Sequence, residues 1–200
     1  PEQAFVRLAA IEILGWLRDP ISFDPLLSHT MDVTWTVRVA TVRALAEFQN
    51  MAAIPSLLLC LGDRHELVRE VAAEVLGRIG SEQAVDGLVK ALADPHSFVR
   101  RAAVEALGEI GLPSVVPYLL ESLNEHDRQV RWSAIEALGK IGDPTTVPQL
   151  IRYLDDPSQP PWAVLSEKRL DEVVVEALEK IGTDEALQAV ASWREKNTLS

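Results

Sequence analysis

The chain has 200 residues, of which 48% are hydrophobic and 24% are charged. This composition supports a folded core and excludes an intrinsically disordered chain. The formal net charge of −11 and the isoelectric point near 4.8 argue against binding to DNA, RNA or anionic lipid, which basic surfaces recognise. The single cysteine, Cys60, lies in an apolar run and is expected to be buried. It leaves no disulfide within the chain, which fits a reducing, cytoplasmic compartment.

A period of 31 residues runs through the chain. The pair Val-Arg recurs at this spacing from Val6-Arg7 to Val130-Arg131, and a leucine follows each valine by eight residues. Two more columns keep the same register. One is acidic, at Asp32, Asp63, Asp94, Glu125 and Asp156, and the other is a leucine column at Leu26, Leu57, Leu88, Leu119 and Leu150. Columns held in register over five copies predict a repeated supersecondary unit.

The repeat orders the expected elements along the chain. They are a half repeat at 1–18, repeats at 19–49, 50–80, 81–111 and 112–142, an interrupted repeat at 143–182 and a capping helix at 183–200. Each full repeat is interpreted as two antiparallel helices. In the clearest second helix, Val99, Ala103 and Leu107 lie at helical spacing on one apolar stripe. Gly111 is expected to end that helix, and Pro117 falls in the first turn of the next.

Neither helix of a pair can bury its stripe alone, so the copies must stack around one continuous core. The sequence therefore predicts an all-α fold, a right-handed α-solenoid of about 12 helices forming a single domain. Small residues such as Ala102 and Ala106 allow the close helix contacts of about 8–10 Å that stacking requires. The arginine column from Arg7 to Arg131 lies beside the core stripe. We expect its guanidinium groups to bond the acidic column or loop carbonyls of an adjacent repeat.

Residues 94–111, with the sequence DPHSFVRRAAVEALGEIG, and their copies resemble a known family. They are similar to the short bacterial and archaeal HEAT repeat, which also occurs in phycobilisome lyase subunits. The resemblance covers nearly the whole chain. It implies a scaffold for protein contacts rather than one particular activity. It also implies that the second helix of each pair lines the concave side of the stack.

The solvent-facing positions of these second helices are the candidate partner-binding site. They combine aromatic side chains, the usual anchors of interfaces, with a line of glutamates. We expect them to bind another protein through a basic or partly apolar segment; the alternative is that they pack against the next repeat or only solvate the helices. The candidate residues are Phe5, Trp16, Trp35, Val39, Arg43, Leu67, Glu70, Glu74, Phe98, Arg101, Glu105, Trp132, Glu136 and Lys140.

The last repeat is nine residues longer than the period, and the extra length falls near 157–167. Insertions in solenoids map to loops that often bind ligands, so Pro160, Pro161 and Trp162 form a second candidate site. The alternative is that Trp162 folds back and caps the final repeat. The half repeat at 1–18 predicts that more chain or a cap precedes it, or that copies associate through this first helix.

The four histidines do not form a catalytic or metal-binding pattern. His65 and His96 occupy the same repeat position one layer apart, about 10 Å from each other, which is too far for one metal with bonds of about 2.0–2.1 Å. The HEAT-repeat enzyme deoxyhypusine hydroxylase holds two irons with several His-Glu pairs, whereas this chain has one, His65-Glu66. We expect no enzymatic activity, metal or cofactor. The resemblance implies one alternative function, the handling of a bilin chromophore as a lyase-type subunit.

Overall fold

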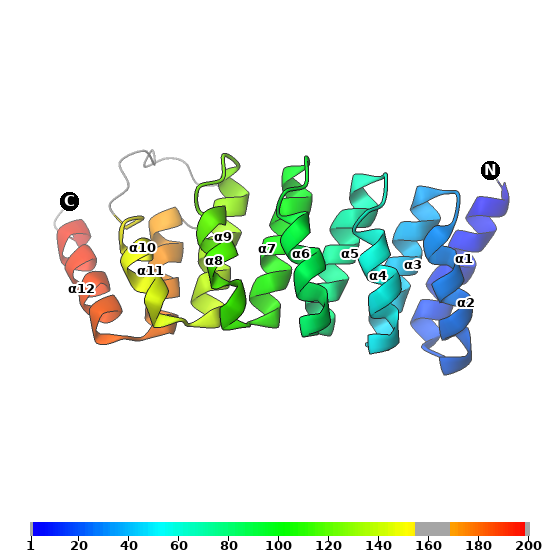
Figure 1. Ribbon diagram of the computed structural model, residues 1–200, viewed down its shortest axis with the longest axis horizontal. Helices are drawn as coiled ribbons and strands as arrows, with labels where there is room; N and C mark the ends of the chain where they lie inside the picture. The colour runs from blue at the N-terminus through cyan, green and yellow to red at the C-terminus, as the bar shows by residue number, and fades with distance from the viewer. Residues whose placement is uncertain (1, 155–168, 199–200) are drawn as a thin grey trace. The chain divides into compact units, whose positions relative to one another are not determined.

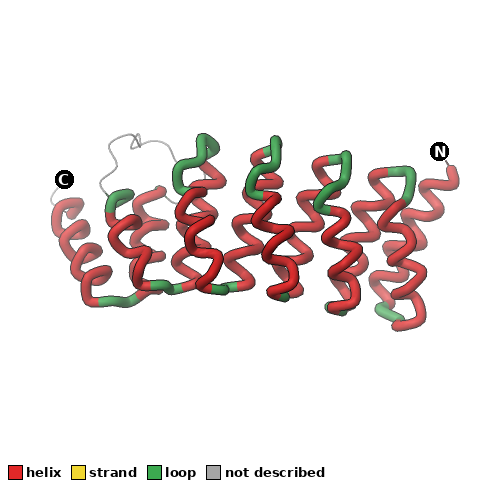
Figure 2. Tube along the Cα trace, in the orientation of Figure 1, coloured by secondary structure: helices red, strands yellow, loops and turns green. Residues whose placement is uncertain are grey.

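The computed structural model describes residues 2–154 and 169–198. Over these residues the chain forms twelve α-helices and six short 3-10 helices, with no strand (Figure 2). The predicted all-helical solenoid class is confirmed. The chain divides into two units, Pro1–Ile110 and Gly111–Ser200, each described here by itself. The insertion near 157–167, with the candidate residues Pro160, Pro161 and Trp162, lies outside the described residues.

Unit 1 alternates long and short helices in two layers (Figure 1). Each long helix packs against the next long helix, and each short helix packs against the long helix that follows it. The long helices are α1 (Glu2–Leu17), α3 (Trp35–Phe48), α5 (Glu66–Ile79) and α7 (Ser97–Ile110). The short helices are α2 (Phe23–Ser28), α4 (Ile54–Cys60) and α6 (Val85–Ala91). The 3-10 helices are η1 (Pro20–Ser22), η2 (His29–Met31), η3 (Met51–Ala53) and η4 (Glu82–Ala84).

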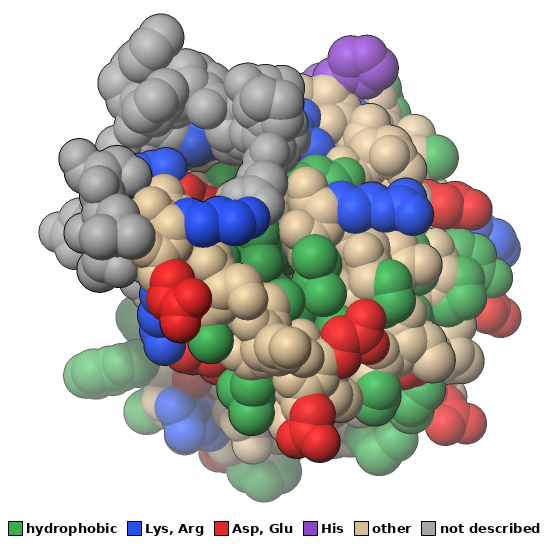
Figure 3. Space-filling model, turned by 90° about the vertical axis from the view of Figure 1, so that its left-hand side faces the viewer, with side chains coloured by type: hydrophobic (Ala, Val, Ile, Leu, Met, Phe, Trp, Pro, Cys, Tyr) green, Lys and Arg blue, Asp and Glu red, His purple; other side chains and the backbone are tan. Residues whose placement is uncertain are grey.

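Unit 2 continues the same alternation. Its elements are η5 (Pro113–Val115), α8 (Val116–Ser122), α9 (Arg128–Ile141), η6 (Pro144–Thr146), α10 (Val147–Ile151), α11 (Leu170–Ile181) and α12 (Asp184–Thr198). The long helix α9 packs on α11, and α12 packs on α10 and α11. Helix α12 buries Ala186 and Val190, and the Trp193 indole donates a 3.1 Å hydrogen bond to the Leu154 carbonyl. On the side of unit 2 where α12 lies, hydrophobic, acidic and basic side chains intermingle (Figure 3).

Glycine and proline set the helix boundaries as predicted. Four glycines at helix ends adopt the left-handed conformation with φ of 70–72°, at Gly80, Gly111, Gly142 and Gly182. In the repeat at 19–49, Gln49 takes the left-handed conformation instead, with φ of 46°. Its crowded Cβ makes this conformation about 1 kcal/mol less favourable than the right-handed one. Pro55 and Pro117 lie in the first turn of α4 and α8, where the missing N–H removes no helical hydrogen bond.

The core follows the repeat columns. In unit 1 the leucine column is buried with no more than 1% of each side chain exposed, at Leu26, Leu57 and Leu88. Small residues bring the long helices together: a Cβ added to Gly77 would lie 2.7 Å from the Cα of Ala106. A Cβ added to Gly15 would likewise lie 2.7 Å from the Cβ of Ala44. Because this approach leaves no room for a side chain, the long helices hold a fixed relation to each other within the unit.

Arginine and aspartate join successive repeats of unit 1, as the sequence predicted. Each arginine donates two hydrogen bonds of 2.6–2.9 Å to the aspartate 25 residues later, in the pairs Arg7–Asp32, Arg38–Asp63 and Arg69–Asp94. Arg38 also donates from Nη1 to the Asp32 carbonyl at 2.8 Å. Burial alone would raise the pKa of Asp63, but the Arg38 hydrogen bonds and the His65 backbone N–H outweigh it and hold that pKa below its usual value. We call these pairs the Arg–Asp ladder.

Candidate partner-binding face

One side of the four long helices of unit 1 carries side chains most of which lie outside the core. On α1 this side carries Phe5, Leu8, Glu12 and Trp16, which are three or four residues apart and so share one side of the helix. The repeat places their counterparts 31, 62 and 93 residues later on α3, α5 and α7. We call this side of α1, α3, α5 and α7 the long-helix face of unit 1.

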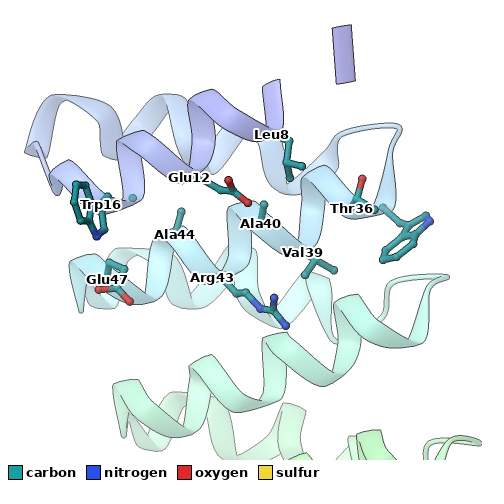
Figure 4. A pocket seen from close by; sticks show the side chains of 11 residues that line it. Leu8, Glu12, Trp16, Thr36, Val39, Ala40, Arg43, Ala44 and Glu47 are labelled. Atoms are coloured by element: carbon teal, nitrogen blue, oxygen red, sulfur yellow. The ribbon is translucent and has the colours of Figure 1, made fainter. Parts of the chain in front are cut away.

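A groove of about 420 Å³ lies on this face between α1 and α3 (Figure 4). Its size is within the range of about 300–1,000 Å³ that ligand pockets occupy. The small residues Gly15, Ala40 and Ala44 form part of its lining, so the groove follows directly from the close approach of the two helices. The other lining residues are Leu8, Glu12, Trp16, Trp35, Thr36, Val39, Arg43 and Glu47.

Two tryptophans lie at opposite ends of this groove, because Trp16 is near the C-terminal end of α1 and Trp35 begins the parallel helix α3. The Trp16 side chain is 88% exposed. Trp35 is 38% exposed, and its ring stacks on the His65 ring with centroids 4.0 Å apart and planes 16° from parallel. His65 is itself held in place, because its Nδ1 accepts the Leu67 N–H at 3.3 Å and so caps α5. The Trp35 ring is therefore held in place at one end of the groove, whereas the Trp16 indole at the other end is open to solvent.

The charges around the groove are unevenly compensated. Glu47 accepts a 2.6 Å hydrogen bond from Arg18, although both side chains are exposed. Arg43 points away from α1 toward the following long helix (Figure 4). The Glu12 carboxylate lies near Ala40 and Ala44 in the same view and makes no hydrogen bond or ion pair with another described residue. The groove thus presents an uncompensated carboxylate among apolar side chains.

Next to the groove, α5 and α7 carry three carboxylates, Glu70, Glu74 and Glu105, which we call the acidic cluster. Arg101 lies among them, with Nη2 3.7 Å from Glu70 Oε1 and Nε 3.8 Å from Glu105 Oε1. These distances are longer than hydrogen bonds. Burial raises the pKa of Glu70 and the Glu74 charge adds to the rise, while Arg101 and Arg43 oppose it. At Glu70, burial and the Glu74 charge therefore outweigh the attraction of the two arginines.

The structure brings two sets of the candidate residues together. Trp16, Trp35, Val39 and Arg43 line the groove, and Glu70, Glu74, Arg101 and Glu105 form the acidic cluster with its arginine. The apolar residues Phe5, Leu67 and Phe98 lie near the N-terminal ends of α1, α5 and α7; Phe5 is 73% exposed, and the Phe98 ring lies 5.5 Å from the His96 ring. The remaining three, Trp132, Glu136 and Lys140, belong to α9 of unit 2, where Trp132 is half-buried and the other two are exposed.

Val39 differs from the expectation that it faces solvent. Its side chain is only 8% exposed because α3 is flanked by α1 and α5, and a short branched side chain does not reach past them. It still lines the groove, as part of its apolar wall. The candidate list also omitted seven of the lining residues, namely Leu8, Glu12, Gly15, Thr36, Ala40, Ala44 and Glu47. The repeat gave a signal for Glu47, which stands 31 residues after Trp16 and therefore at the equivalent position of α3.

The described part of the chain shows neither a metal cluster nor a membrane span. Residues 2–154 and 169–198 contain no group of three or more His, Cys, Asp or Glu side chains placed to hold a metal ion. None of the helices described in these two ranges is long and apolar enough to cross a membrane.

Comparison with known families and structures agrees with the repeat. A sequence profile described as HEAT repeats matches residues 23–107 and 85–166, and one described as PBS lyase HEAT-like repeat matches residues 6–29. No curated protein matches the chain in sequence.

Three solved structures illustrate the likeness in fold. The complex of CpcE and CpcF of phycocyanin lyase from Nostoc sp. PCC7120 has a TM-score of 0.63 at 21% identity, covering 95% of this chain and 88% of that one. The Escherichia coli protein YibA has a TM-score of 0.64 at 26% identity, covering 88% of this chain, which spans only 62% of YibA. A computationally designed armadillo repeat protein for modular peptide recognition has a TM-score of 0.52 at 18% identity, covering 96% and 98%.

Proposed function

Since the chain belongs to the HEAT repeat family, we propose that this helical repeat scaffold binds a segment of another protein on the long-helix face of unit 1. The observation that carries the proposal is the groove between α1 and α3, with the 88% exposed Trp16 at one end. Tryptophan is highly buried on average, so an 88% exposed side chain is unusual, and tryptophan is enriched among the residues that dominate binding energy at protein interfaces.

The composition of the face also suits a protein partner. The groove is lined mainly by apolar side chains, and charged side chains lie at its border and on the neighbouring helices. An apolar centre with a polar rim is the usual anatomy of an interface between proteins. The likeness in fold to a designed armadillo repeat protein supports the proposal, because that protein is a stack of helical repeats made for peptide recognition.

The charges disfavour the alternative, the handling of a bilin. That alternative rests on the likeness in fold to phycocyanin lyase. A bilin carries two carboxylates, whereas the groove lining holds one guanidinium, that of Arg43, beside the carboxylates of Glu12 and Glu47, and Glu47 is already paired with Arg18. The lining therefore has no surplus of positive charge for a ligand with two carboxylates, and a basic or neutral ligand fits better. Titration of the protein with a bilin at micromolar concentration is expected to leave the visible absorption spectrum of the bilin unchanged.

A selection from a random library of displayed 12-residue peptides tests the proposal. The enriched peptides would be synthesised, and their dissociation constants measured by fluorescence polarisation on wild type, on Trp16→Ala and on Tyr118→Ala. Tyr118 is a matched control, because it is an exposed aromatic residue on the short helix α8 of unit 2. Thermal melting of each variant would verify that the fold is kept.

We expect Trp16→Ala to weaken binding by about 30-fold, the effect of losing a hot-spot residue worth about 2 kcal/mol. Tyr118→Ala should bind as wild type does. The proposal fails if the library yields no specific peptide, or if both variants bind the enriched peptides as tightly as wild type.

A further inference from the structure

The long-helix face of unit 1 changes character from one helix to the next. The positions that carry Leu8 and Val39 on α1 and α3 carry Glu70 and Arg101 on α5 and α7. The apolar groove therefore lies over α1 and α3, and the acidic cluster lies over α5 and α7. A ligand that touches both regions must cross the helices rather than lie along one of them.

The distance between the two regions fixes the length of such a ligand. Neighbouring packed helices are about 8–10 Å apart, so the groove and the acidic cluster are separated by about 15–25 Å. An extended chain advances about 3.3 Å per residue and covers this distance with about five to eight residues. A helical segment rises about 1.5 Å per residue and would need roughly twice as many. An extended segment is the shorter bridge.

The carboxylates of the two regions determine which charged side chains the segment carries. The Glu70 side chain is 16% exposed, and it lies near Glu74 and Glu105, with Arg101 at ion-pair rather than hydrogen-bond distance. Burial raises the pKa of Glu70, and the attraction of a further cation would offset that rise. In the groove, the Glu12 carboxylate has no cationic partner among the described residues. Both regions thus favour lysine or arginine over aspartate or glutamate.

We infer, on the basis of the proposed function, that the partner is an extended protein segment crossing the long helices of unit 1, with a large apolar side chain in the groove and lysine or arginine side chains against the acidic cluster. The apolar anchor and the first basic residue are about five to eight residues apart. The anchor contributes most of the affinity, because it displaces water from the groove. The basic residues select among partners and speed association.

The same displayed library tests this inference with a different pair of variants. Glu74→Gln/Glu105→Gln removes two exposed charges of the acidic cluster, while Glu82→Gln/Glu121→Gln removes two exposed charges from the short-helix elements η4 and α8. The two variants change the net charge equally, so the second controls for long-range attraction. Each enriched peptide would be measured on both variants, together with a copy of the peptide in which serine replaces its basic residues.

We expect the enriched peptides to combine one large apolar residue with one or more basic residues about five to eight positions away. Their affinity should fall about tenfold on Glu74→Gln/Glu105→Gln, and by less than twofold on the control variant. The serine peptides should bind wild type and Glu74→Gln/Glu105→Gln equally.

Two results separate this inference from the proposed function. If enriched peptides lose affinity on Trp16→Ala but show no preference for basic residues, or respond alike to both glutamine variants, the inference is wrong and the proposed function stands. If no peptide is enriched by the wild-type protein, both are wrong.

Discussion

Replacement of Arg38 by alanine should destabilise the fold far more than a typical surface substitution. Arg38 is 5% exposed and donates two 2.6 Å hydrogen bonds to Asp63, whose side chain is 12% exposed. It also satisfies the Asp32 carbonyl at 2.8 Å. The alanine variant leaves Asp63 ionised, largely buried and without its cation. Breaking a buried pair in this way costs about 3–5 kcal/mol of the free energy of unfolding.

Arg18→Ala is the matched control. Arg18 donates a 2.6 Å hydrogen bond to Glu47, so the bond is as short as those of Arg38, but the two side chains are 63% and 42% exposed. Solvent screens such a pair, and its loss costs about 1 kcal/mol or less. The free energy of unfolding of both variants would be measured by urea titration, followed by circular dichroism at pH 7. A loss of less than 1 kcal/mol for Arg38→Ala, or equal losses for both variants, would refute the reasoning.

The pH dependence gives a second check on the same pair. The pKa of Asp63 is lowered in the folded protein, so its pairing stabilises the fold above the unfolded pKa of about 3.9 and is lost as the pH falls through the lower folded value. Without Arg38 the lowering disappears. The difference in stability between wild type and Arg38→Ala should therefore be largest at neutral pH and shrink below about pH 4.

Three further predictions concern packing, reactivity and acid stability. Gly77→Ala should lower the free energy of unfolding by about 1–3 kcal/mol, because its Cβ would lie 2.7 Å from the Ala106 Cα. Gly62→Ala is the control: its Cβ would meet only the Leu59 carbonyl oxygen at 3.5 Å, so the free energy of unfolding should change by less than about 0.5 kcal/mol. Equal effects of the two substitutions would contradict the close helix contact. Burial raises the pKa of the Cys60 thiol to about 11. Iodoacetamide at pH 8 should therefore alkylate the folded protein at least about a hundred times more slowly than the urea-unfolded chain, as measured by mass spectrometry. Comparable rates would show that the thiol is accessible in the folded protein. The ladder carboxylates Asp32, Asp63 and Asp94 all have lowered pKa values, so wild-type stability should hold from pH 7 to about pH 5 and fall below about pH 4; unchanged stability at pH 3 would argue against the ladder.

The repeat made most of the fold predictable. A strict period places every Val-Arg pair at the same point of a long helix, so one copy predicts the helices and the Arg–Asp ladder in its neighbours. Gly80 and Pro55 mark helix boundaries for reasons that are local to the backbone, and local rules transfer from sequence to structure well. The 3-10 turns that open the short helices were not predicted, because they carry no periodic signal of their own.

The binding face was less predictable, because its details depend on contacts between repeats. The stacking of Trp35 on His65 joins α3 to the cap of α5, and nothing within either segment indicates it. The sequence indicated only that His65 is not part of a catalytic or metal-binding pattern, whereas the structure stacks its ring on Trp35 at the end of the groove. The burial of Val39 likewise follows from its neighbours on both sides rather than from its own helix.

The location of binding can be measured directly with the tryptophans of the chain, which are spread over both units. Protein labelled with 5-fluorotryptophan would be titrated with the most enriched library peptide and followed by ¹⁹F NMR, with each resonance assigned by a Trp→Phe substitution. Trp16 and Trp35 line the groove of unit 1, while Trp132 and Trp193 belong to α9 and α12 of unit 2. The account predicts saturable shifts of the Trp16 and Trp35 resonances with Trp132 and Trp193 unchanged. Saturable shifts of Trp132 or Trp193, with Trp16 and Trp35 unchanged, would contradict it.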